Sequence, residues 1–449
     1  MTREKQIVID AINQKAPLIA GTADKIWEYA ELSLQEYKSA ALYCETLEKE
    51  GFQVQKGIAG IETAFCASFG SGRPVIGILA EYDALSGLSQ KSGSLKQEEI
   101  VAGGNGHGCG HNLLGAGAMA AAIGVKAFMG ETKCPGTVIL YGCPGEEGGA
   151  AKAFMARDGV WKDLDAALTW HPHDSNEVVT GSSNSCIQVQ YKFMGKASHA
   201  SGAPEKGRSA LDAVELMNIG VQFLREHMSD RARIHYAITD AGGVSPNVVQ
   251  PKASVLYMVR SNHVAEAVEL QARVDKIAEG AALMTETTYE RKFIDGCADT
   301  VTNHVLESVM YENFEQLGVP TYTEEELCYA DALAKTYSGS DNVPGIGAAN
   351  DTGIHMQVAK LRQEFGHSMN QFLLPQYQGD AFEPGSTDVG DVSWLTPTVQ
   401  IHVASWPNGC PGHSWQNVSC DRTEIGHKAA VHAGKVLAMG AVDLFQKPE

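Results

Sequence analysis

Apolar segments of strand length alternate with helical segments through the first 180 residues of the chain. The strand candidates are "TAFCASFG", "PVIGILAEYDAL", "GTVILYG" and "AALTW", and the predicted helices span residues 3–15, 26–50, 112–128 and 150–157. Apolar strands that are separated by helices form parallel sheets with both faces covered. The alternation therefore predicts an α/β fold with a mostly parallel central sheet and helices on both faces.

The pattern changes near residue 185, where a block with a different order begins. "CIQVQYKFMGKASHA" alternates like a half-exposed strand, and a helix, two strands, a second helix and a last strand follow up to residue 296. This β-α-β-β-α-β order is typical of a ferredoxin-like α+β domain. We therefore predict a discontinuous larger domain, residues 1–185 and 297–449, into which a small domain is inserted at 186–296. The most linker-like stretch is 338–347.

Charge and cysteine content restrict the kind of protein. The 449 residues carry a formal net charge of −19, which disfavours binding to nucleic acid or to an anionic membrane surface. The first residues lack the apolar core of a signal peptide, and we expect no apolar run to span a bilayer. The ten cysteines show no repeated spacing, so we expect a cytoplasmic protein with reduced thiols.

Residues that suit metal binding or catalysis follow several predicted strands. "CPGEEGG" follows one strand, "HPHD" another, "NGCPGHSWQ" a third, and "VAGGNGHGCGHNLL" precedes the helix at 112–128. Ligands bind at the carboxyl ends of parallel strands, so we expect these loops to meet at one edge. Their candidate side chains are Cys109, His111, Glu146, Glu147, His171, His173 and His413. Thiolate, imidazole and carboxylate together suit Zn²⁺ or another borderline divalent ion.

Other interpretations of the glycine-rich segment fit less well. A phosphate loop would need Lys-Ser/Thr after the glycines, covalent haem would need C-x-x-C-H, and a thioredoxin-like pair would need C-x-x-C. A cysteine protease would leave Glu146, Glu147 and His413 without a role. Each residue alone also has an ordinary explanation, as a surface histidine, a buried thiol or a solvated turn. Their joint occurrence favours the metal site.

The motifs place the chain beside a known family. "HGCGHN", "CPGEEGG", "TWHP", "GKASHASGAPEKGRSALDAVELM", "SPNVVQPKASVLYMVR" and "GSTDVGDVS" resemble, in this order, motifs of the di-metal amidohydrolases and peptidases that include aminoacylase, hippurate hydrolase and carboxypeptidase G. The resemblance runs from about residue 20 to the last helix. It implies an enzyme that cleaves linear amide bonds with a water molecule activated by metal.

The resemblance also implies the cofactor and the residues of the site. Two Zn²⁺ or Mn²⁺ ions per chain would be bound by Cys109, His111, Glu147, His171 and His413, with Cys109 bridging the ions. Glu146 would be the general base. The inserted domain would act as a lid and dimerisation domain. From it His199 would reach toward the substrate, typically that of the partner subunit, and Asn247 and Arg260 would bind the carbonyl and carboxylate of the substrate.

The substrate is less narrowly defined by the motifs. "GSTDVGD" replaces the "G-x-E-D-F" of hippurate hydrolases, which favours the aminobenzoyl-glutamate group and p-aminobenzoyl-glutamate as substrate. The alternatives are a dipeptidase, another N-acyl-amino-acid hydrolase of the auxin or hippurate type, a scaffold subunit of a two-chain hydrolase, or a metal carrier without turnover. The dimer partner would be an identical or a related chain.

Three further residues have minor expected roles. "CPGEEGG" stands where the amidohydrolase branch usually has "QPAEEGG", so we interpret Cys143 as a packing residue near the site. We expect His173 to support a ligand or to lie at the surface, and Asp388 to lie near the pocket.

Overall fold

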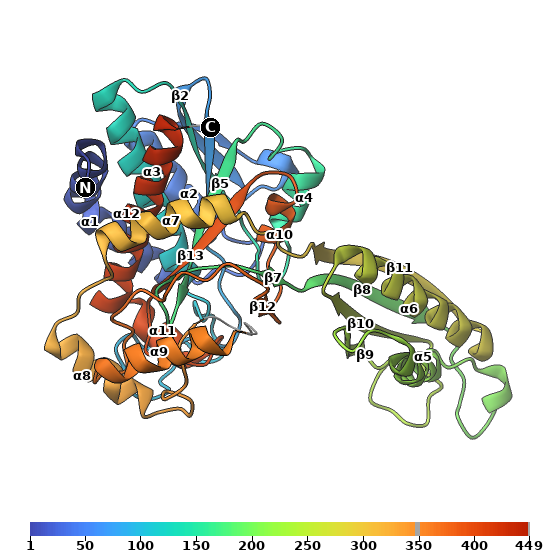
Figure 1. The fold of residues 1–449 in the computed structure, drawn as a ribbon. Helices are drawn as coiled ribbons and strands as arrows, with labels where there is room; N and C mark the ends of the chain where they lie inside the picture. Colours follow the sequence, from blue (N-terminus) through green and yellow to red (C-terminus); the bar gives the residue numbers. More distant parts are fainter. Residues whose placement is uncertain (346–350, 448–449) are drawn as a thin grey trace. The chain divides into compact units, whose positions relative to one another are not determined.

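The structure is a computed structural model that describes residues 1–345 and 351–447 (Figure 1). It divides into two compact units. The first unit contains Met1–Ser182, Val301–Glu383 and Asp391–Glu449, and the second contains Ser183–Thr300 and Pro384–Gly390. The predicted insertion at 186–296 lies within the second unit, but the sequence did not assign 384–390 to it. The predicted linker 338–347 lies in the first unit, and its last two residues lie outside the described residues.

The first unit contains a seven-stranded sheet. Its spatial order is β1 (Gln53–Lys56), β2 (Phe65–Ser71), β4 (Gly136–Gly142), β3 (Val75–Ala80), β5 (Ala166–His173), β13 (Thr398–Ala404) and β6 (Glu177–Val178). The strands β4, β3, β5 and β13 are parallel, whereas β1, β2 and β6 pair in antiparallel fashion at the edges. The prediction of a mixed α/β fold is confirmed, and its parallel strands form the centre of the sheet.

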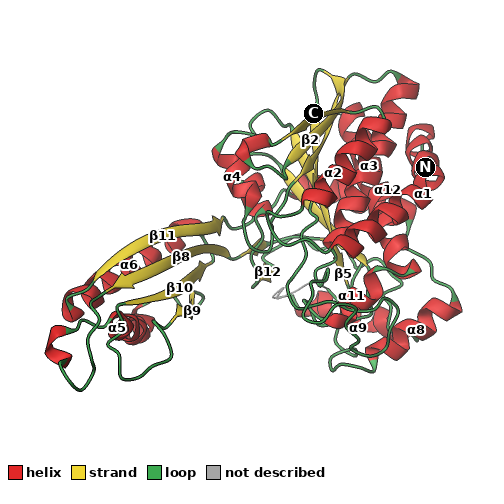
Figure 2. Cartoon of the chain, turned by 180° about the vertical axis from the view of Figure 1, so that it is seen from behind, coloured by secondary structure: helices red, strands yellow, loops and turns green. Residues whose placement is uncertain are grey.

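Helices cover this sheet unequally. The described helices of the first unit are α1 (Arg3–Tyr29), α2 (Tyr37–Lys49), α3 (His111–Thr132), α4 (Ala151–Arg157), α7 (His304–Leu317), α8 (Glu324–Ala334), α9 (Thr352–Glu364), α11 (Trp415–Asp421) and α12 (Glu424–Gln446), while the residues of α10 (Val389–Ser393) are divided between the two units. Helices α1, α3 and α12 pack together on one face, and the short α4 lies on the other (Figure 2). The largest apolar core lies under α1, α3 and α12.

The N-terminal helices differ from their predicted bounds. The helix predicted at 3–15 continues to Tyr29, although Pro17 lies inside it. Pro17 is exposed, as is Asn13, so water can satisfy the carbonyl that loses its amide partner to the proline ring. Helix α1 ends where Ala30 adopts a left-handed conformation with φ of 42°. The helix predicted at 26–50 is therefore interrupted: residues 26–29 belong to α1, residues 30–36 are not helical, and α2 covers Tyr37–Lys49.

Helix α3 also corrects an expectation from the sequence. By length and composition its 22 residues could cross a membrane, contrary to our expectation that no run could. Yet 83% of its most apolar stretch is buried inside the protein, between the sheet, α1 and α12. Glycine and alanine make this close packing possible. Its apolar character is therefore that of a core helix.

The second unit has the predicted order of elements. It contains β8 (Ser185–Met194), α5 (Ala210–Leu224), β9 (Arg233–Asp240), β10 (Lys252–Ser261), α6 (Val264–Thr285) and β11 (Thr288–Cys297). The strands form an antiparallel sheet in the order β11-β8-β10-β9, and α5 and α6 pack on it around a separate apolar core. Three short 3₁₀ helices and the two-residue strands β7 (Ser182–Ser183) and β12 (Phe382–Glu383) complete the described elements.

Candidate metal centre

The carboxyl ends of the parallel strands in the first unit carry the predicted site residues. His171 lies near the end of β5, and Glu146 and Glu147 follow β4 in the turn before α4. Cys109 immediately precedes Gly110, the residue that caps the N-terminus of α3, and His413 lies in the loop after β13. Parallel strands end at the same sheet edge, so this topology brings residues that are far apart in the sequence into one place.

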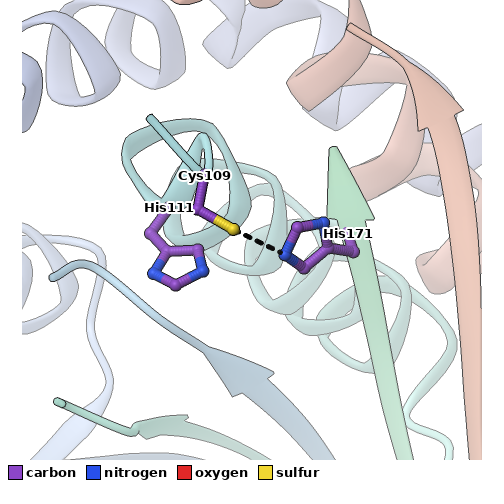
Figure 3. A group of neighbouring side chains, drawn as sticks. All are labelled: Cys109, His111 and His171. Atoms are coloured by element: carbon purple, nitrogen blue, oxygen red, sulfur yellow. Dashed lines mark hydrogen bonds between the residues drawn. The ribbon is translucent and has the colours of Figure 1, made fainter. Parts of the chain in front are cut away.

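The five predicted metal ligands form two adjacent groups that share one thiol. In one group the ligand atoms of Cys109, His111 and His171 all lie within 4.8 Å of one another, and in the other those of Cys109, Glu147 and His413 do. Cys109 Sγ is 3.5 Å from Nε2 of His171 (Figure 3), and Nε2 of His413 is 3.3 Å from Oε1 of Glu147. The structure therefore brings the predicted ligands together, and metal binding by them stays a prediction.

Glycine permits the tight turn that directs Cys109 and His111 to one point. Gly110 has a φ of 73°, in the left-handed region that glycine adopts most readily. A Cβ atom at this position would also lie only 3.0 Å from side-chain atoms of Pro172 and Trp406. His413 has a φ of 54°, which is uncommon for a residue with a side chain and is found most often at functional sites.

Buried atoms of this cluster fit a cation. His111 Nε2 and Glu147 Oε1 are buried and form no hydrogen bond within the described part of the chain. Each has an oppositely charged group nearby: His111 Nε2 lies 3.3 Å from Oε2 of Glu81, and Glu147 Oε1 lies 3.3 Å from Nε2 of His413. Unpaired buried polar atoms are costly, and a bound divalent ion would satisfy these two. The donor set of one thiol, three imidazoles and one carboxylate matches the ligands that Zn²⁺ and similar ions accept.

The protonation of the ligands depends on their burial. Burial raises the pKa of the Cys109 thiol, and the carboxylate of Glu147 raises it further, while His111 lowers it. Burial lowers the pKa of His171, and His111 and His402 add to this effect, so His171 is the neutral imidazole that a metal requires. A cation at the thiol would offset the cost of the buried thiolate.

Asp83 supports the cluster and was missed in the sequence. Its Oδ1 accepts a hydrogen bond from Nδ1 of His111 at 2.8 Å, and its Oδ2 accepts from the amide of Glu147 and the hydroxyl of Ser33. Burial alone would raise the pKa of Asp83, but His111 and these donors lower it to about 2. An ionised Asp83 orients His111 as a carboxylate orients a metal-bound imidazole. Asp83 could have been noticed in the sequence because it lies just after β3, at the edge of the sheet where the ligands meet.

A buried ion pair lies on the other side of His111. Lys152 is fully buried, and its Nζ lies 2.6 Å from Oε1 of Glu81, which follows β3. A carboxylate oxygen of Glu146 lies within 4.8 Å of the ligand atoms of both Glu81 and His111. Glu146 thus lies beside the cluster, outside the two groups that share Cys109. Its role as base stays a prediction.

The remaining predicted site residues lie in the second unit. The backbone amide of Ala200, next to His199, donates to the carbonyl of Asn247 at 3.0 Å, so these two segments are adjacent. Nδ1 of His199 accepts hydrogen bonds from the amides of Ser201 and Gly202, at 3.2 and 3.0 Å. The ring proton therefore lies on Nε2, which can donate to another group.

The structure also defines the contacts of three other residues, Arg260, Asp388 and Cys143. Arg260 lies on β10, and its Nη1 donates to the hydroxyl of Ser386 at 2.6 Å. Asp388 is buried in the second unit near Asp295, and burial together with Asp388 raises the pKa of Asp295 to about 6. Cys143 is fully buried in an apolar cluster of the first unit, in agreement with a packing role.

Comparisons with known proteins agree on one family. Residues 77–358 match the model of peptidase family M20/M25/M40. The chain is 44% identical to one subunit of the p-aminobenzoyl-glutamate hydrolase of Escherichia coli K12, over 98% of this chain and 92% of that protein. It is 29% identical to the Xaa-Arg dipeptidase of Mus musculus, over 99% and 89%. A dinuclear metal-binding peptidase of Bacillus subtilis shares the fold, with a TM-score of 0.58, 18% identity and coverage of 97% and 99%.

Proposed function

The chain belongs to peptidase family M20/M25/M40, and from this membership we propose that it hydrolyses p-aminobenzoyl-glutamate to p-aminobenzoate and glutamate. As a member of the family it is a metal-dependent hydrolase of amide bonds. The observation that carries the proposal is the pair of ligand groups that share Cys109. The substrate is inferred from the 44% identity to the aminobenzoyl-glutamate hydrolase subunit over nearly the whole chain.

The ligand geometry suggests two divalent ions per chain, Zn²⁺ or Mn²⁺. Cys109 would bind both ions, His111 and His171 one of them, and Glu147 and His413 the other. Two ions bound there would supply a water of lowered pKa and positive charge for the carbonyl oxygen. The buried atoms of His111 and Glu147 that lack hydrogen bonds support this assignment.

In the proposed mechanism, four side chains have roles besides metal binding. The carboxylate of Glu146 accepts a proton from the attacking water and then gives it to the amine nitrogen of glutamate as the amide bond breaks. Nε2–H of His199 donates a hydrogen bond to the carbonyl oxygen as that oxygen gains charge. Asn247 and Arg260 bind the carbonyl and carboxylate groups of the glutamate moiety, for which the planar guanidinium of Arg260 is suited.

Two substitutions at adjacent glutamates test these roles. Glu146→Gln should lower kcat roughly 100- to 10,000-fold and leave the metal content of the chain at the wild-type level, because it removes the base but no ligand. Glu147→Gln should lower the metal content itself. Turnover and metal content are measured on the same samples. Normal turnover by Glu146→Gln, or no hydrolysis of any conjugate by the metal-loaded wild-type chain, would refute the proposed function.

A dipeptidase function is the second candidate. It is favoured by the 29% identity to the Xaa-Arg dipeptidase over nearly the whole chain. A panel that contains p-aminobenzoyl-glutamate, hippurate and dipeptides ending in arginine separates the two functions by kcat/KM. Assay of this chain alone also tests the scaffold alternative, because a scaffold subunit would show no turnover without a second polypeptide.

The second unit is proposed as the lid and dimerisation domain. Its order of elements and strands supports a ferredoxin-like fold. The partner would be an identical or related chain, and His199 would act on the substrate bound by that partner. If so, co-expressed Glu146→Gln and His199→Ala subunits should recover about a quarter of wild-type activity. Random pairing makes about half of the dimers mixed, and in each mixed dimer one of the two sites combines an intact Glu146 with an intact His199. No recovery would place His199 in its own chain's site.

The proposed location is the cytoplasm. The described residues contain no disulfide bond among the ten cysteines, and the thiol of Cys109 must stay reduced to bind metal.

A further inference from the structure

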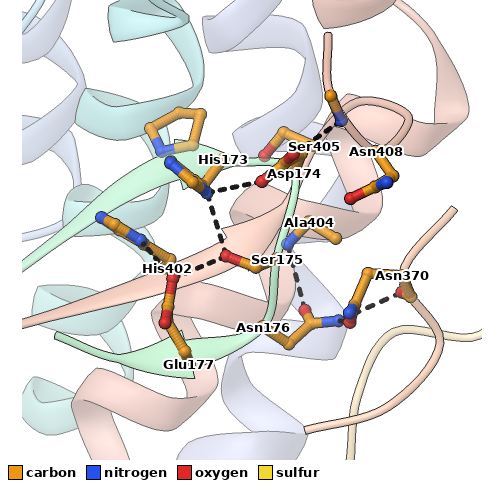
Figure 4. A network of polar contacts seen from close by, with 12 residues as sticks. His173, Asp174, Ser175, Asn176, Glu177, Asn370, His402, Ala404, Ser405 and Asn408 are labelled. Carbon is orange, nitrogen blue, oxygen red and sulfur yellow. Dashed lines mark hydrogen bonds and ion pairs between the residues drawn. The ribbon is translucent and has the colours of Figure 1, made fainter. Parts of the chain in front are cut away.

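A second cluster of possible metal ligands lies at the same sheet edge, outside the predicted dinuclear centre. It consists of His173 at the end of β5, Glu177 on β6 and His402 on β13 (Figure 4). Their ligand atoms all lie within 4.8 Å of one another. None of the three residues belongs to the two groups that share Cys109, so the cluster is a separate set of ligands.

The side chains of this cluster lie in direct contact with one another. The rings of His173 and His402 stack, with centroids 4.2 Å apart and planes 10° from parallel. Nδ1 of His402 lies 3.1 Å from Oε1 of Glu177. The hydroxyl of Ser175 lies 2.9 Å from Nδ1 of His173 and 2.7 Å from the same Glu177 oxygen. These contacts hold two imidazoles and a carboxylate close to one another.

The surroundings of the cluster are negatively charged. The three residues line a cavity of about 190 Å³ whose other lining residues include Asp174 and Glu383, and no lysine or arginine among the described residues lines it. Oδ1 of Asp174 lies 2.9 Å from Nδ1 of His173. A carboxylate next to a histidine ligand is the usual support of a protein metal site. This charge favours a cation over an anionic ligand.

We propose that His173, Glu177 and His402 bind a third divalent transition-metal ion, with Zn²⁺ as the best match to two imidazoles and a carboxylate. The ring of His402 lies beside that of His171, with centroids 6.3 Å apart, so this ion would neighbour the predicted dinuclear centre. It would also fasten the edge strand β6 to β13. The proposal goes beyond the proposed function, because it uses no residue assigned to hydrolysis.

Cobalt titration separates this site from the dinuclear centre. Co²⁺ bound to the thiolate of Cys109 gives a sulfur-to-metal charge-transfer band in the near ultraviolet, whereas a site of nitrogen and oxygen ligands gives only ligand-field bands. We expect the wild-type chain to bind three Co²⁺ ions, and three Zn²⁺ ions in equilibrium dialysis. His402→Asn and Glu177→Gln should each bind one ion fewer and keep the full charge-transfer band.

His427→Asn is the matched control. The side chain of His427 has the same 15% exposure as that of His402 and also contacts carboxylates, but no second imidazole forms a ligand group with it among the described residues. This variant should still bind three ions. A wild-type chain with two ions, or three ions in both His402→Asn and Glu177→Gln, would overturn the third site. Ion binding that His402→Asn abolishes, in a wild-type chain without any thiolate band, would support this site and refute the dinuclear centre instead.

Discussion

At the scale of single residues, buried carboxylates determine how the predicted ligands are held. Asp83 and Glu36 are both buried, yet their pKa values move in opposite directions. Asp83 faces His111 and stays ionised. Glu36 is buried beside the negative charge of Asp83, and the hydrogen bonds that it accepts from the Leu34 amide and the Thr63 hydroxyl do not offset these two effects. The two therefore lead to different predictions.

Asp83→Asn should weaken metal binding about ten- to hundredfold, because Asp83 orients His111 through a 2.8 Å hydrogen bond. The affinity is measured by competition with a chromophoric chelator. Asp24→Asn is the control, since Asp24 forms an equivalent 2.8 Å contact with His427, a residue of neither ligand group. Equal metal affinities in the two variants would contradict the role of Asp83.

Glu36→Gln should change the pH dependence of stability. Burial, with the charge of Asp83, raises the pKa of Glu36 from 4.5 to about 7. The folded chain binds this proton more tightly than the unfolded chain, so the stability that Glu36 contributes is complete below about pH 4.5 and is lost as the pH rises through 7. Above pH 7 the free energy of unfolding of the neutral variant should thus exceed that of the wild type by about 3 kcal/mol, relative to their difference at low pH.

The gain is measured as the difference between the free energies of urea unfolding of variant and wild type across this pH range. In the variant the glutamine oxygen can still accept from the amide of Gly145, which Glu36 holds at 2.8 Å in the loop that carries Glu146. Glu45→Gln, an exposed position on α2, should show no such pH trend. If the difference in unfolding free energy between Glu36→Gln and the wild type stayed constant across the pH range, Glu36 would not titrate in this range.

At the scale of elements, α3 joins the core to the metal centre through close contacts at glycine. A Cβ atom on Gly115 would lie 2.2 Å from the hydroxyl of Tyr43 and 2.7 Å from the backbone carbonyl of Glu81. The helix therefore approaches β3 and α2 more closely than any larger residue permits. By contrast, Gly130 near the end of the same helix has nothing within 4 Å of a Cβ.

Gly115→Ala should destabilise the protein by about 1–3 kcal/mol through overpacking. Gly130→Ala, in the same helix, should stabilise it by about 0.5–1 kcal/mol, because alanine favours the helix and meets no obstacle. Denaturant unfolding of both variants measures the effects. Effects of the same sign would mean that helix propensity, and not the close contact with Tyr43 and Glu81, controls these positions.

The elements also show what could be predicted from the sequence. The loops that carry the five ligand candidates could be identified because they follow predicted strands or precede a predicted helix, and the resemblance to the family then selected the five ligands among their side chains. Asp83, Glu81 and Lys152 were missed because burial and pairing give them their roles, and their partners are distant in sequence. His402 could not be assigned either. It lies inside β13, and only the register that pairs it with His171 places it at the site.

At the scale of the whole molecule, all predicted metal ligands belong to the first unit, and the second unit has its own core. Metal should therefore stabilise the two units unequally. Binding to the folded state alone contributes about 2.7 kcal/mol for each site when the metal is at a hundredfold its Kd. The first unit should receive this stabilisation.

Removal of metal by a chelator should lower the unfolding temperature of the first unit and increase hydrogen exchange near the start of α3. Exchange in β8 to β11 should change little, because that sheet contains no ligand of the centre. Calorimetry and exchange followed by mass spectrometry provide the two measurements. Cys109→Ser should already unfold at the lower temperature and respond weakly to the chelator. An equal loss of protection in both units would contradict the assignment.

The second unit includes the separate segment Pro384–Gly390, and this has a practical consequence for protein engineering. A gene fragment encoding residues 183–300 alone would omit the Ser386 hydroxyl that accepts from Arg260, and the Pro384 carbonyl that accepts from Asn184. It would also uncover Ala298, against which Gly390 fits so closely that a Cβ atom there would collide with the backbone carbonyl. Transplanting the inserted domain into another scaffold therefore requires grafting two separate stretches of polypeptide.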